Sequence, residues 1–190
     1  MLKVIALGGE PATGKTTLIF KLMSMADDWK VCKPQKLLDA LYSEKLRTYI
    51  LGKYENDGNV FQGTDRLSMA VQPDAVKFID DLRQNAENVN VIFEGDRLFN
   101  GKFLEHIADN VPEEDFKILV LRASHDEKEK RHVDRNDDQD DKFKNSRETK
   151  ISNICSSLIL MGYIETMVNE NFDDQKKIIE NIKTFFWSEK

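Results

Sequence analysis

Short apolar runs alternate along the chain with segments in which apolar side chains recur at helical spacing. Brief runs rich in Val and Ile, separated by helical patterns, are typical of strands buried on both faces of a parallel sheet. Three such runs are Val4–Leu7, Val89–Phe93 and Lys117–Leu121, and a fourth candidate is Ile164–Val168. The pattern predicts an α/β fold of three layers, with a central parallel sheet and helices on both faces.

Apolar stripes on one face predict three helices between and after these strands. The predicted helices are Thr16–Met25, Ala75–Leu82 and Gln175–Phe186. Pro73 and Asp74 favour the start of the second helix, since both residue types are common in a first helical turn. The last of the three is the closing helix of the chain, with Ile178, Ile179 and Ile182 on its apolar face.

Two regions depart from this alternation. Residues 29–66 are uneven, with a predicted strand at Arg47–Leu51 and a polar turn at Asn56–Asn59. Residues 124–150 are almost all charged, which is usual for a solvated helical hairpin. Their position between two predicted core strands favours a second interpretation, a charged helical lid over about residues 122–150. Repeats and low-complexity linkers are missing from the sequence, so we expect one domain over residues 1–190.

Composition adds constraints on class and surroundings. The chain has 190 residues, 40% hydrophobic and 33% charged, and a net charge of −6. This charge argues against coating nucleic acid by bulk attraction but allows one local basic groove. Cys32 and Cys155 are far apart and lack ligand-spaced partners, which favours free thiols in a reducing cytoplasm. The apolar N-terminal run is too short for a signal peptide or a membrane span, so a soluble cytoplasmic protein is expected.

The segment Gly9-Glu-Pro-Ala-Thr-Gly14-Lys15-Thr16 fits the phosphate-loop pattern G-x4-G-K-[ST], placed between a predicted strand and a predicted helix. Glycines let backbone amides turn toward phosphate oxygens, and the helix N-terminus adds its dipole. Lys15 is expected to bridge the β- and γ-phosphates, and the Thr16 hydroxyl to bind Mg²⁺. The segment therefore predicts ATP and Mg²⁺ as ligands. The residues predicted to bind ATP are Gly9, Ala12, Thr13, Gly14, Lys15, Thr16 and, as a secondary candidate, Thr17.

The segment Glu94-Gly-Asp96-Arg97 follows a predicted buried strand. Ligands of open α/β sheets sit at the carboxyl ends of strands, where these side chains emerge. Glu94 is expected to order Mg²⁺ through water, with Asp96 and Arg97 facing an acceptor. A strand-capping turn with a surface salt bridge is the structural alternative. Two acids at one strand end repel each other unless a cation or a base joins them, which favours the functional interpretation.

The segment Gly63-Thr64-Asp65-Arg66 contains a second candidate carboxylate. Asp65 is predicted either to cap the following helix or to align an acceptor hydroxyl, with Arg66 beside it. Asp65 and Asp96 are the two candidates for the catalytic base, and the sequence leaves the choice open.

Cations of the predicted lid form the fourth group. Arg131 and Arg135 are four residues apart and share one face of a helix. They are predicted to close over the triphosphate and to neutralise charge that develops during transfer. The intervening acids allow an alternative in which these bases pair with their neighbours.

Together these segments resemble the P-loop nucleoside and nucleotide kinase superfamily over most of the chain. A closer resemblance is to phage-type DNA kinases that act on 5-hydroxymethyluracil. It rests on Gly52-Lys-Tyr54, Gly63–Met69, Glu94–Arg97, and the stretch from Arg131 through Gln139 to Arg147–Lys150.

The resemblance implies a P-loop kinase fold, and a kinase that transfers the γ-phosphate of ATP to the hydroxymethyl group of that base in phage DNA, in a host cytoplasm. An extruded base needs an apolar or aromatic pocket, for which the candidates are Tyr49, Tyr54, Phe61 and Phe99. The acidic net charge departs from what an enzyme that grips duplex DNA suggests. A nucleoside or nucleotide kinase and a small-molecule phosphotransferase are the alternative enzymes, and a nucleotide-binding regulatory ATPase module is the alternative of another class.

Overall fold

The computed structural model describes residues 1–54, 62–85, 88–134 and 141–188. It is an α/β fold with one seven-stranded, mostly parallel sheet, and the described residues form six α-helices. The strands are β1 (Leu2–Gly9), β2 (Lys30–Gln35), β3 (Leu38–Ser43), β4 (Thr48–Leu51), β5 (Val89–Glu94), β6 (Phe116–Arg122) and β7 (Ile164–Val168). The helices are α1 (Lys15–Met23), α2 (Gln72–Gln84), α3 (Gly101–Asn110), α4 (His125–Asp134), α5 (Asp141–Cys155) and α6 (Phe172–Trp187).

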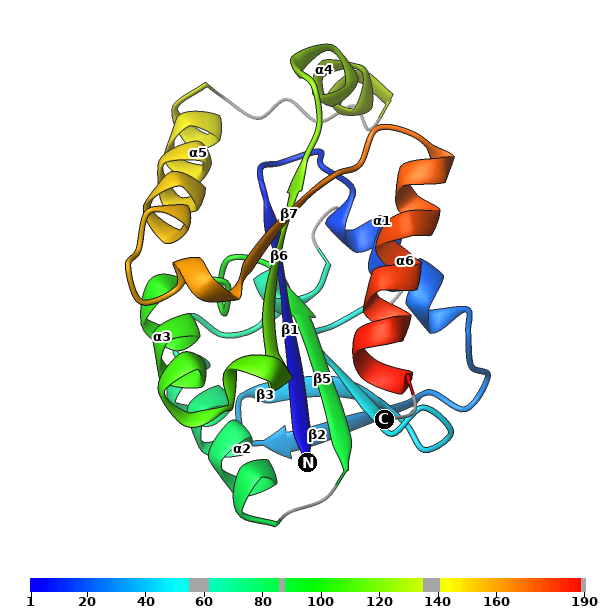
Figure 1. Cartoon of the computed structure of the whole chain (residues 1–190), viewed down its shortest axis with the longest axis vertical. Coiled ribbons are helices and arrows are strands. Elements are labelled where there is room, and N and C mark those ends of the chain that lie inside the picture. The colour runs from blue at the N-terminus through cyan, green and yellow to red at the C-terminus, as the bar shows by residue number, and fades with distance from the viewer. Residues whose placement is uncertain (55–61, 86–87, 135–140, 189–190) are drawn as a thin grey trace.

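The strand order is β2-β3-β4-β5-β1-β6-β7. Strands β4, β5, β1, β6 and β7 are parallel to one another, whereas β2, β3 and β4 pair antiparallel. β1 lies between β5 and β6, with Leu7 opposite both Glu94 and Leu119. The carboxyl ends of β1, β5 and β6 therefore meet at one edge of the sheet, near α4 (Figure 1).

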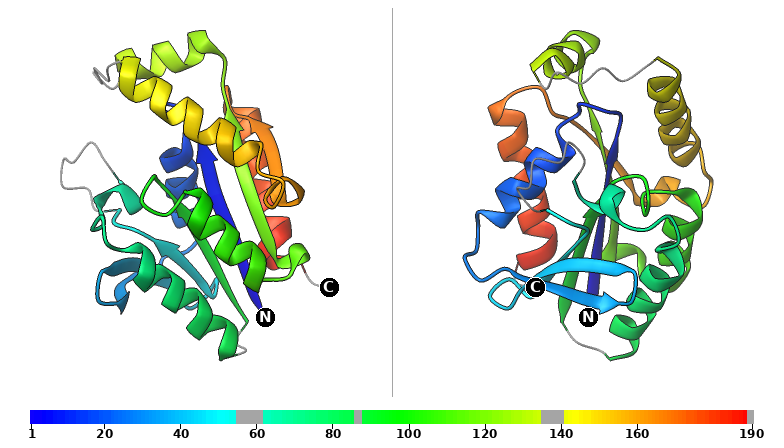
Figure 2. Two further views of the ribbon diagram at one scale, coloured as in Figure 1. Left: turned by 90° about the vertical axis from the view of Figure 1, so that its left-hand side faces the viewer. Right: turned by 180° about the vertical axis from the view of Figure 1, so that it is seen from behind.

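Helices cover both faces of the sheet, as Figures 1 and 2 show. Alternate residues of β1 enter different cores: Val4 and Ala6 pack with α2, α3 and the end of α5, whereas Ile5 and Leu7 pack with α1 and α6. This period of two is the geometry of a strand buried on both sides, which explains why its sequence is continuously apolar. The layers agree with the three-layer α/β arrangement that the sequence predicts.

The predicted strands all appear, and so do the three predicted helices, with ends shifted by a few residues. The sequence interpretation missed β2, β3 and α3. β2 is a solvent-facing edge strand that exposes Lys30, Val31 and Lys33, so it lacks the apolar run of a buried strand. Helix α3 follows directly on the Glu94–Arg97 turn, where Asn100 caps it by accepting a hydrogen bond from the Phe103 amide at 3.1 Å. The predicted turn at Asn56–Asn59 lies outside the described residues.

The charged segment forms α4 and α5. Helix α4 stands beyond the carboxyl edge of the sheet, and α5 lies on the side of α3 (Figures 1 and 2). The last turns of α5 are anchored by Ile151 and Ile154, which are buried in the core shared with α2 and α3. The first helix of the predicted lid is thus set above the sheet edge, and the second joins that edge to the main core.

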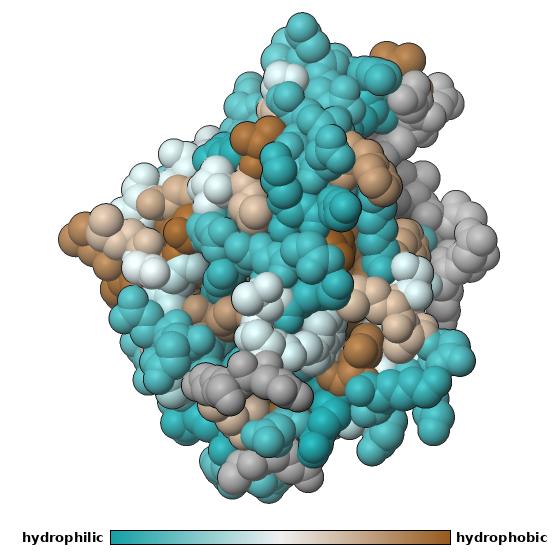
Figure 3. Space-filling model, turned by 45° about the vertical axis from the view of Figure 1, so that its right-hand side comes forward, coloured by the Kyte–Doolittle hydropathy of each residue, from teal (hydrophilic) through white to brown (hydrophobic). Residues whose placement is uncertain are grey.

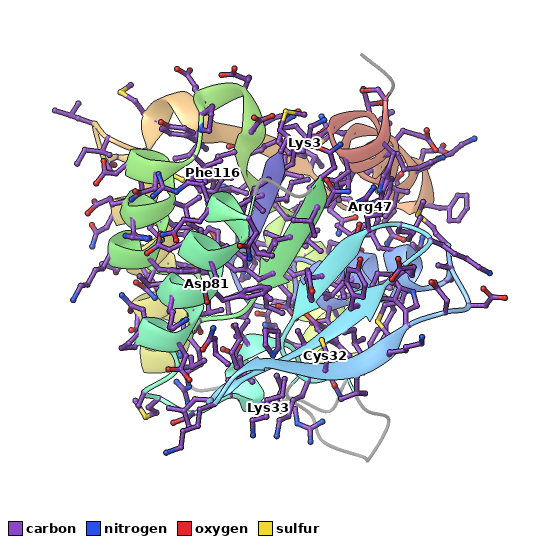
Figure 4. The ribbon with its side chains drawn as sticks, turned by 90° about the horizontal axis from the view of Figure 1, so that it is seen from below. Lys3, Cys32, Lys33, Arg47, Asp81 and Phe116 are labelled. Carbon is purple, nitrogen blue, oxygen red and sulfur yellow. The ribbon has the colours of Figure 1, made fainter. Side chains whose placement is uncertain are left out.

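Figure 4 shows the molecule from the opposite edge of the sheet, where Lys3, Arg47 and Phe116 lie at or just before the starts of β1, β4 and β6. There the Lys3 ammonium donates a hydrogen bond to the Phe185 carbonyl at 2.6 Å, which joins β1 to α6. The surface in Figure 3 is hydrophilic over most of its area, with apolar side chains in small separate groups. No helix in the described part of the chain combines the length and the apolar composition needed to cross a bilayer.

Candidate functional site

The segment Gly9–Thr16 forms a tight loop between β1 and α1. Gly9, Ala12 and Gly14 have positive φ angles of 136°, 60° and 86°. Successive amides in such alternating conformations turn inward and make a concave anion-binding surface, to which the first turn of α1 contributes. A hydrogen bond within the loop stabilises it: the Thr13 hydroxyl donates to the Glu10 carbonyl at 2.8 Å. Its geometry fits a polyphosphate.

The Lys15 ammonium lies across the mouth of this loop. It donates hydrogen bonds to the carbonyl oxygens of Gly9 at 2.9 Å and Glu10 at 2.8 Å. A cation at this place is positioned to meet phosphate oxygens that enter the loop. Of the two threonines at the start of α1, Thr16 turns toward β5 and Thr17 is exposed.

The Thr16 hydroxyl donates a hydrogen bond to the Glu94 carboxylate at 3.0 Å. Glu94 is 3% exposed. Burial raises the pKa of Glu94 to about 7, and the Lys15 ammonium acts against this shift. A hydroxyl and a carboxylate side by side are ligands suited to Mg²⁺, which takes its remaining ligands from water and phosphate. In the part of the chain that the structure describes, three or more His, Cys, Asp or Glu side chains nowhere gather into a metal-binding group.

Asp65 and Asp96 lie side by side, brought together by the turns that follow β4 and β5. The Asp65 carboxylate accepts a hydrogen bond from the Asp96 amide at 2.6 Å. The Thr64 hydroxyl donates to the Glu94 carbonyl at 2.8 Å and fixes the two turns to each other. The pKa of Asp65 is raised, first by burial and second by the neighbouring Asp96 carboxylate.

The two Asp residues differ in their partners. Both oxygens of Asp96 face cations of α5: Arg147 Nη1 lies 2.7 Å from Oδ2, and Lys150 Nζ lies 3.0 Å from Oδ1. The Lys150 ammonium also donates to the Asp96 carbonyl at 3.0 Å. Both residues lie within the segment predicted as the lid, but the sequence offered no reason to pair them with Asp96. Their spacing of three on one helix was the signal that they act together.

Arg131 of α4 reaches the phosphate loop. Its guanidinium donates to the carbonyl oxygens of Ala12 at 3.0 Å and Asn169 at 2.9 Å. Its Nε also donates to Glu127 at 2.8 Å, so part of the predicted neighbour pairing exists as well. Arg135 lies outside the described residues.

Glu10 of the loop holds two more cations of this region. Its carboxylate accepts hydrogen bonds from Arg122 at 2.8 Å and from Lys128. Glu10 therefore joins β6 and α4 to the loop, a role that the sequence did not suggest because the residue occupies a variable position of the motif.

Two asparagines after β7 support the site differently. The buried Asn169 amide donates to the Thr13 carbonyl at 2.6 Å and braces the loop from the side of β7. Asn171 caps α6 by accepting a hydrogen bond from the Asp174 amide at 3.0 Å.

Arg66 and Arg97 lie in the turns that follow Asp65 and Asp96, and both are half-buried. Arg97 Nε is buried without a hydrogen-bond partner among the described residues. Each predicted acceptor-binding arginine directly follows one of the two carboxylates in sequence, so both belong to the turns at this edge of the sheet.

The aromatic residues considered for a base platform are not exposed beside the carboxylates. Tyr49 packs between Tyr42 and Phe78, with ring centroids at 4.4 Å and 5.1 Å. Phe99 is buried, and its ring occupies the space that a Cβ on Gly8 would need. Tyr54 is also buried, while Phe61 lies outside the described residues. The described candidates are core residues.

Comparisons with known proteins leave the family open. No protein-family model matches the chain, and no curated protein matches it. A solved structure of an uncharacterized protein from Eubacterium ventriosum aligns with 96% of this chain and 98% of its own, at 18% identity and a TM-score of 0.42. A similarity of this size defines neither a family nor an activity for the chain.

Proposed function

We propose that the protein is an ATP- and Mg²⁺-dependent kinase with a P-loop fold that phosphorylates an alcohol. The observation that carries the proposal is the meeting of two parts at one sheet edge. The loop with Lys15 and the Thr16–Glu94 pair form the first part, and the Asp65–Asp96 pair forms the second. Phosphoryl transfer needs a cradle for the polyphosphate and one carboxylate that aligns the attacking oxygen, and these parts meet that requirement.

The reaction follows from these positions. Loop amides and Lys15 hold the β- and γ-phosphates, while Thr16 and Glu94 hold the metal site. Mg²⁺, when bound, offsets the negative charge of the phosphates. Asp65 accepts the proton of the acceptor hydroxyl as its oxygen bonds to the γ-phosphorus. The bond from that phosphorus to the bridging oxygen of ADP breaks, and ADP leaves with the electron pair.

Asp65 is assigned as the base because Asp96 is already engaged. Both oxygens of the Asp96 carboxylate are bound by cations of α5, so they are occupied by partners other than an acceptor hydroxyl. The pKa of Asp65 is raised, and its carboxylate accepts a hydrogen bond from a backbone amide at 2.6 Å, so Asp65 is the better proton acceptor. Asp96 instead positions Arg147 and Lys150.

The acceptor class rests on the resemblance to DNA kinases that act on 5-hydroxymethyluracil. We assign the hydroxymethyl group of this base in DNA as the acceptor, with a nucleoside or nucleotide as the alternative. Cations from α5 beside the carboxylates suit an acceptor that carries phosphate, whereas a neutral small alcohol does not require them.

The test is transfer from ATP labelled at the γ-phosphate, offered with four acceptors: DNA containing hydroxymethyluracil, the same DNA with thymine, free nucleosides, and nucleotides. Label in the hydroxymethylated DNA alone supports the assignment. Label in nucleosides or nucleotides would show that the acceptor is not DNA, and the assignment as a kinase would stand. Label released only as inorganic phosphate would overturn the kinase and favour a regulatory ATPase.

A further inference from the structure

The Tyr54 hydroxyl is a buried polar group to which the proposed reaction gives no role. Tyr54 is 8% exposed, and its hydroxyl oxygen has no hydrogen-bond partner among the described residues. Burial, and after it the Glu94 and Asp65 carboxylates, raise the pKa of Tyr54 well above its usual range, so the phenol keeps its proton. Buried hydroxyl groups normally have a protein or water partner, because an unsatisfied donor is costly. The hydroxyl therefore requires a partner that the protein itself does not supply.

The backbone and the packing of the ring fix Tyr54 at the candidate site. The Lys53 amide donates a hydrogen bond to the Gly63 carbonyl at 3.0 Å, and the Gly63 amide donates to the Lys53 carbonyl at 2.8 Å. The Tyr54 ring packs edge-on against Phe20 of α1, with 6.1 Å between the ring centroids. Phe20 comes four residues after Thr16, so the two share one face of the helix. The ring thus lies on the side of α1 that carries a proposed metal ligand.

The hydroxyl and the Glu94 carboxylate border the same space beside Gly63. A Cβ built on Gly63 would lie 2.6 Å from Glu94 Oε1 and 3.0 Å from the Tyr54 hydroxyl oxygen. The two oxygens are therefore close to one point, yet the hydroxyl makes no direct hydrogen bond to Glu94. Glu94 Oε1 is also the atom that accepts from the Thr16 hydroxyl at 3.0 Å. A single water molecule between the oxygens of Tyr54 and Glu94 can bond to both.

We infer that Tyr54 is a positioning residue of the metal site, whose hydroxyl donates a hydrogen bond to a water molecule shared with Glu94 and so holds that carboxylate in place for Mg²⁺. The inference rests on the proposed function and adds a residue to it. Carboxylates that bind metals are themselves held by hydrogen-bonding groups, and loss of such a group weakens metal binding. The Thr16 hydroxyl bonds to the same carboxylate, so two hydroxyls orient it.

The experiment measures ADP binding by calorimetric titration, once with Mg²⁺ and once with a chelator, so it does not depend on turnover. The dissociation constant in chelator divided by that in Mg²⁺ gives the metal-dependent gain in affinity. Tyr54→Phe keeps the ring and removes the oxygen, and it is expected to lower this gain about tenfold. The affinity in chelator is expected to stay unchanged. The melting temperature in chelator should stay near that of the wild type, because the lost hydroxyl has no direct partner among the described residues.

Two further variants separate this role from a structural one. Tyr163→Phe is the matched control, because the Tyr163 hydroxyl donates to the Ala108 carbonyl at 3.2 Å and its ring packs on Phe116 at the start of β6. It is expected to keep the wild-type gain. Glu94→Gln removes the charged group on which Tyr54 is inferred to act. Tyr54→Phe added to Glu94→Gln is therefore expected to cause no further loss of the gain.

Three outcomes overturn the inference: Tyr54→Phe keeps the wild-type gain, its effect persists in full beside Glu94→Gln, or Mg²⁺ leaves the ADP affinity of the wild type unchanged. The first two leave the proposed kinase in place. Failure of the kinase gives a different pattern. Absence of phosphate transfer together with a Tyr54-dependent gain would reject the proposed reaction and leave the role of Tyr54 standing.

Discussion

In the proposed reaction, single side chains at the carboxyl edge of the sheet carry the chemistry, and Lys15 is the first of them. Its ammonium bonds carbonyl groups of its own loop, so its removal exchanges local contacts for water. We expect Lys15→Ala to lower kcat by about a hundredfold or more, with the melting temperature nearly unchanged. The control is Lys21→Ala on the same helix, since Lys21 binds Gln175 away from the loop. Near wild-type turnover by Lys15→Ala would contradict the role.

A substitution at Asp65 distinguishes between two roles for this residue, a catalytic base and a structural cap. Asparagine keeps an oxygen that can accept the Asp96 amide, so Asp65→Asn preserves the contact between the two turns. It cannot take a proton, and we expect kcat to fall about a hundredfold or more with the ATP dissociation constant changed little. Steady-state kinetics and ATP titration measure the two effects. Equal loss of turnover and ATP affinity would identify Asp65 as a cap.

Glu94 makes stability depend on pH. Its pKa is about 7 in the folded protein, against an ordinary value of 4.5. Between these values the folded chain holds a proton that the unfolded chain has lost. The stability from this proton is complete below pH 4.5 and is lost as pH rises through 7.

In Glu94→Gln the loss is absent, because glutamine does not titrate. Without Mg²⁺, the unfolding free energy of the wild type is expected to fall relative to that of Glu94→Gln by about 3 kcal/mol between acid and alkaline pH. Chemical denaturation of both proteins across this range provides the measurement. Curves that stay parallel would show that Glu94 ionises normally.

At the scale of elements, the site depends on how the turn after β4 docks on the end of β5. Gly63 has a φ angle of 71°, and a Cβ there would lie 2.6 Å from Glu94 Oε1 and 3.0 Å from the Tyr54 hydroxyl. Only a residue without a side chain allows this approach. The docking brings Asp65 to Asp96.

Gly63→Ala is therefore expected to destabilise the fold by about 1–3 kcal/mol and to displace the carboxylates. Gly101→Ala is the matched control, because its added Cβ meets only Glu105 Oε1 at 4.0 Å and alanine suits the first turn of α3. Denaturant unfolding compares the two. Equal stabilities would show that the turn accommodates a side chain.

At the scale of the whole molecule, the net charge of −6 limits how the protein meets a polyanion. Arg147 and Lys150 stand beside the site but are partly offset by Asp96. Few phosphates are then neutralised, so the dependence of DNA binding on salt is expected to be weak, with a log–log slope smaller than about 3 in magnitude. Binding measured between about 50 and about 200 mM salt determines it. A slope typical of extensive backbone contacts would point to a duplex-gripping surface.

The sequence by itself determined the parts whose signals are local. The continuous apolar runs predict β1, β5 and β6 because both faces of these strands are buried, and the glycine pattern predicts the loop because only certain residues adopt its backbone angles. Edge strand β2 was not predicted, because its side chains are largely exposed and its sequence therefore has no apolar pattern.

The tertiary structure alone decided which side chains meet. Thr16 and Glu94, Asp65 and Asp96, and Asp96 with Lys150 are separated by 78, 31 and 54 positions, and their contacts follow from strand order and helix packing. Strand order placed the ends of β1 and β5 side by side, and burial at that junction raised the pKa of Glu94. The residue pattern of a segment determines its secondary structure, whereas contacts between residues distant in the chain depend on how all the elements pack together.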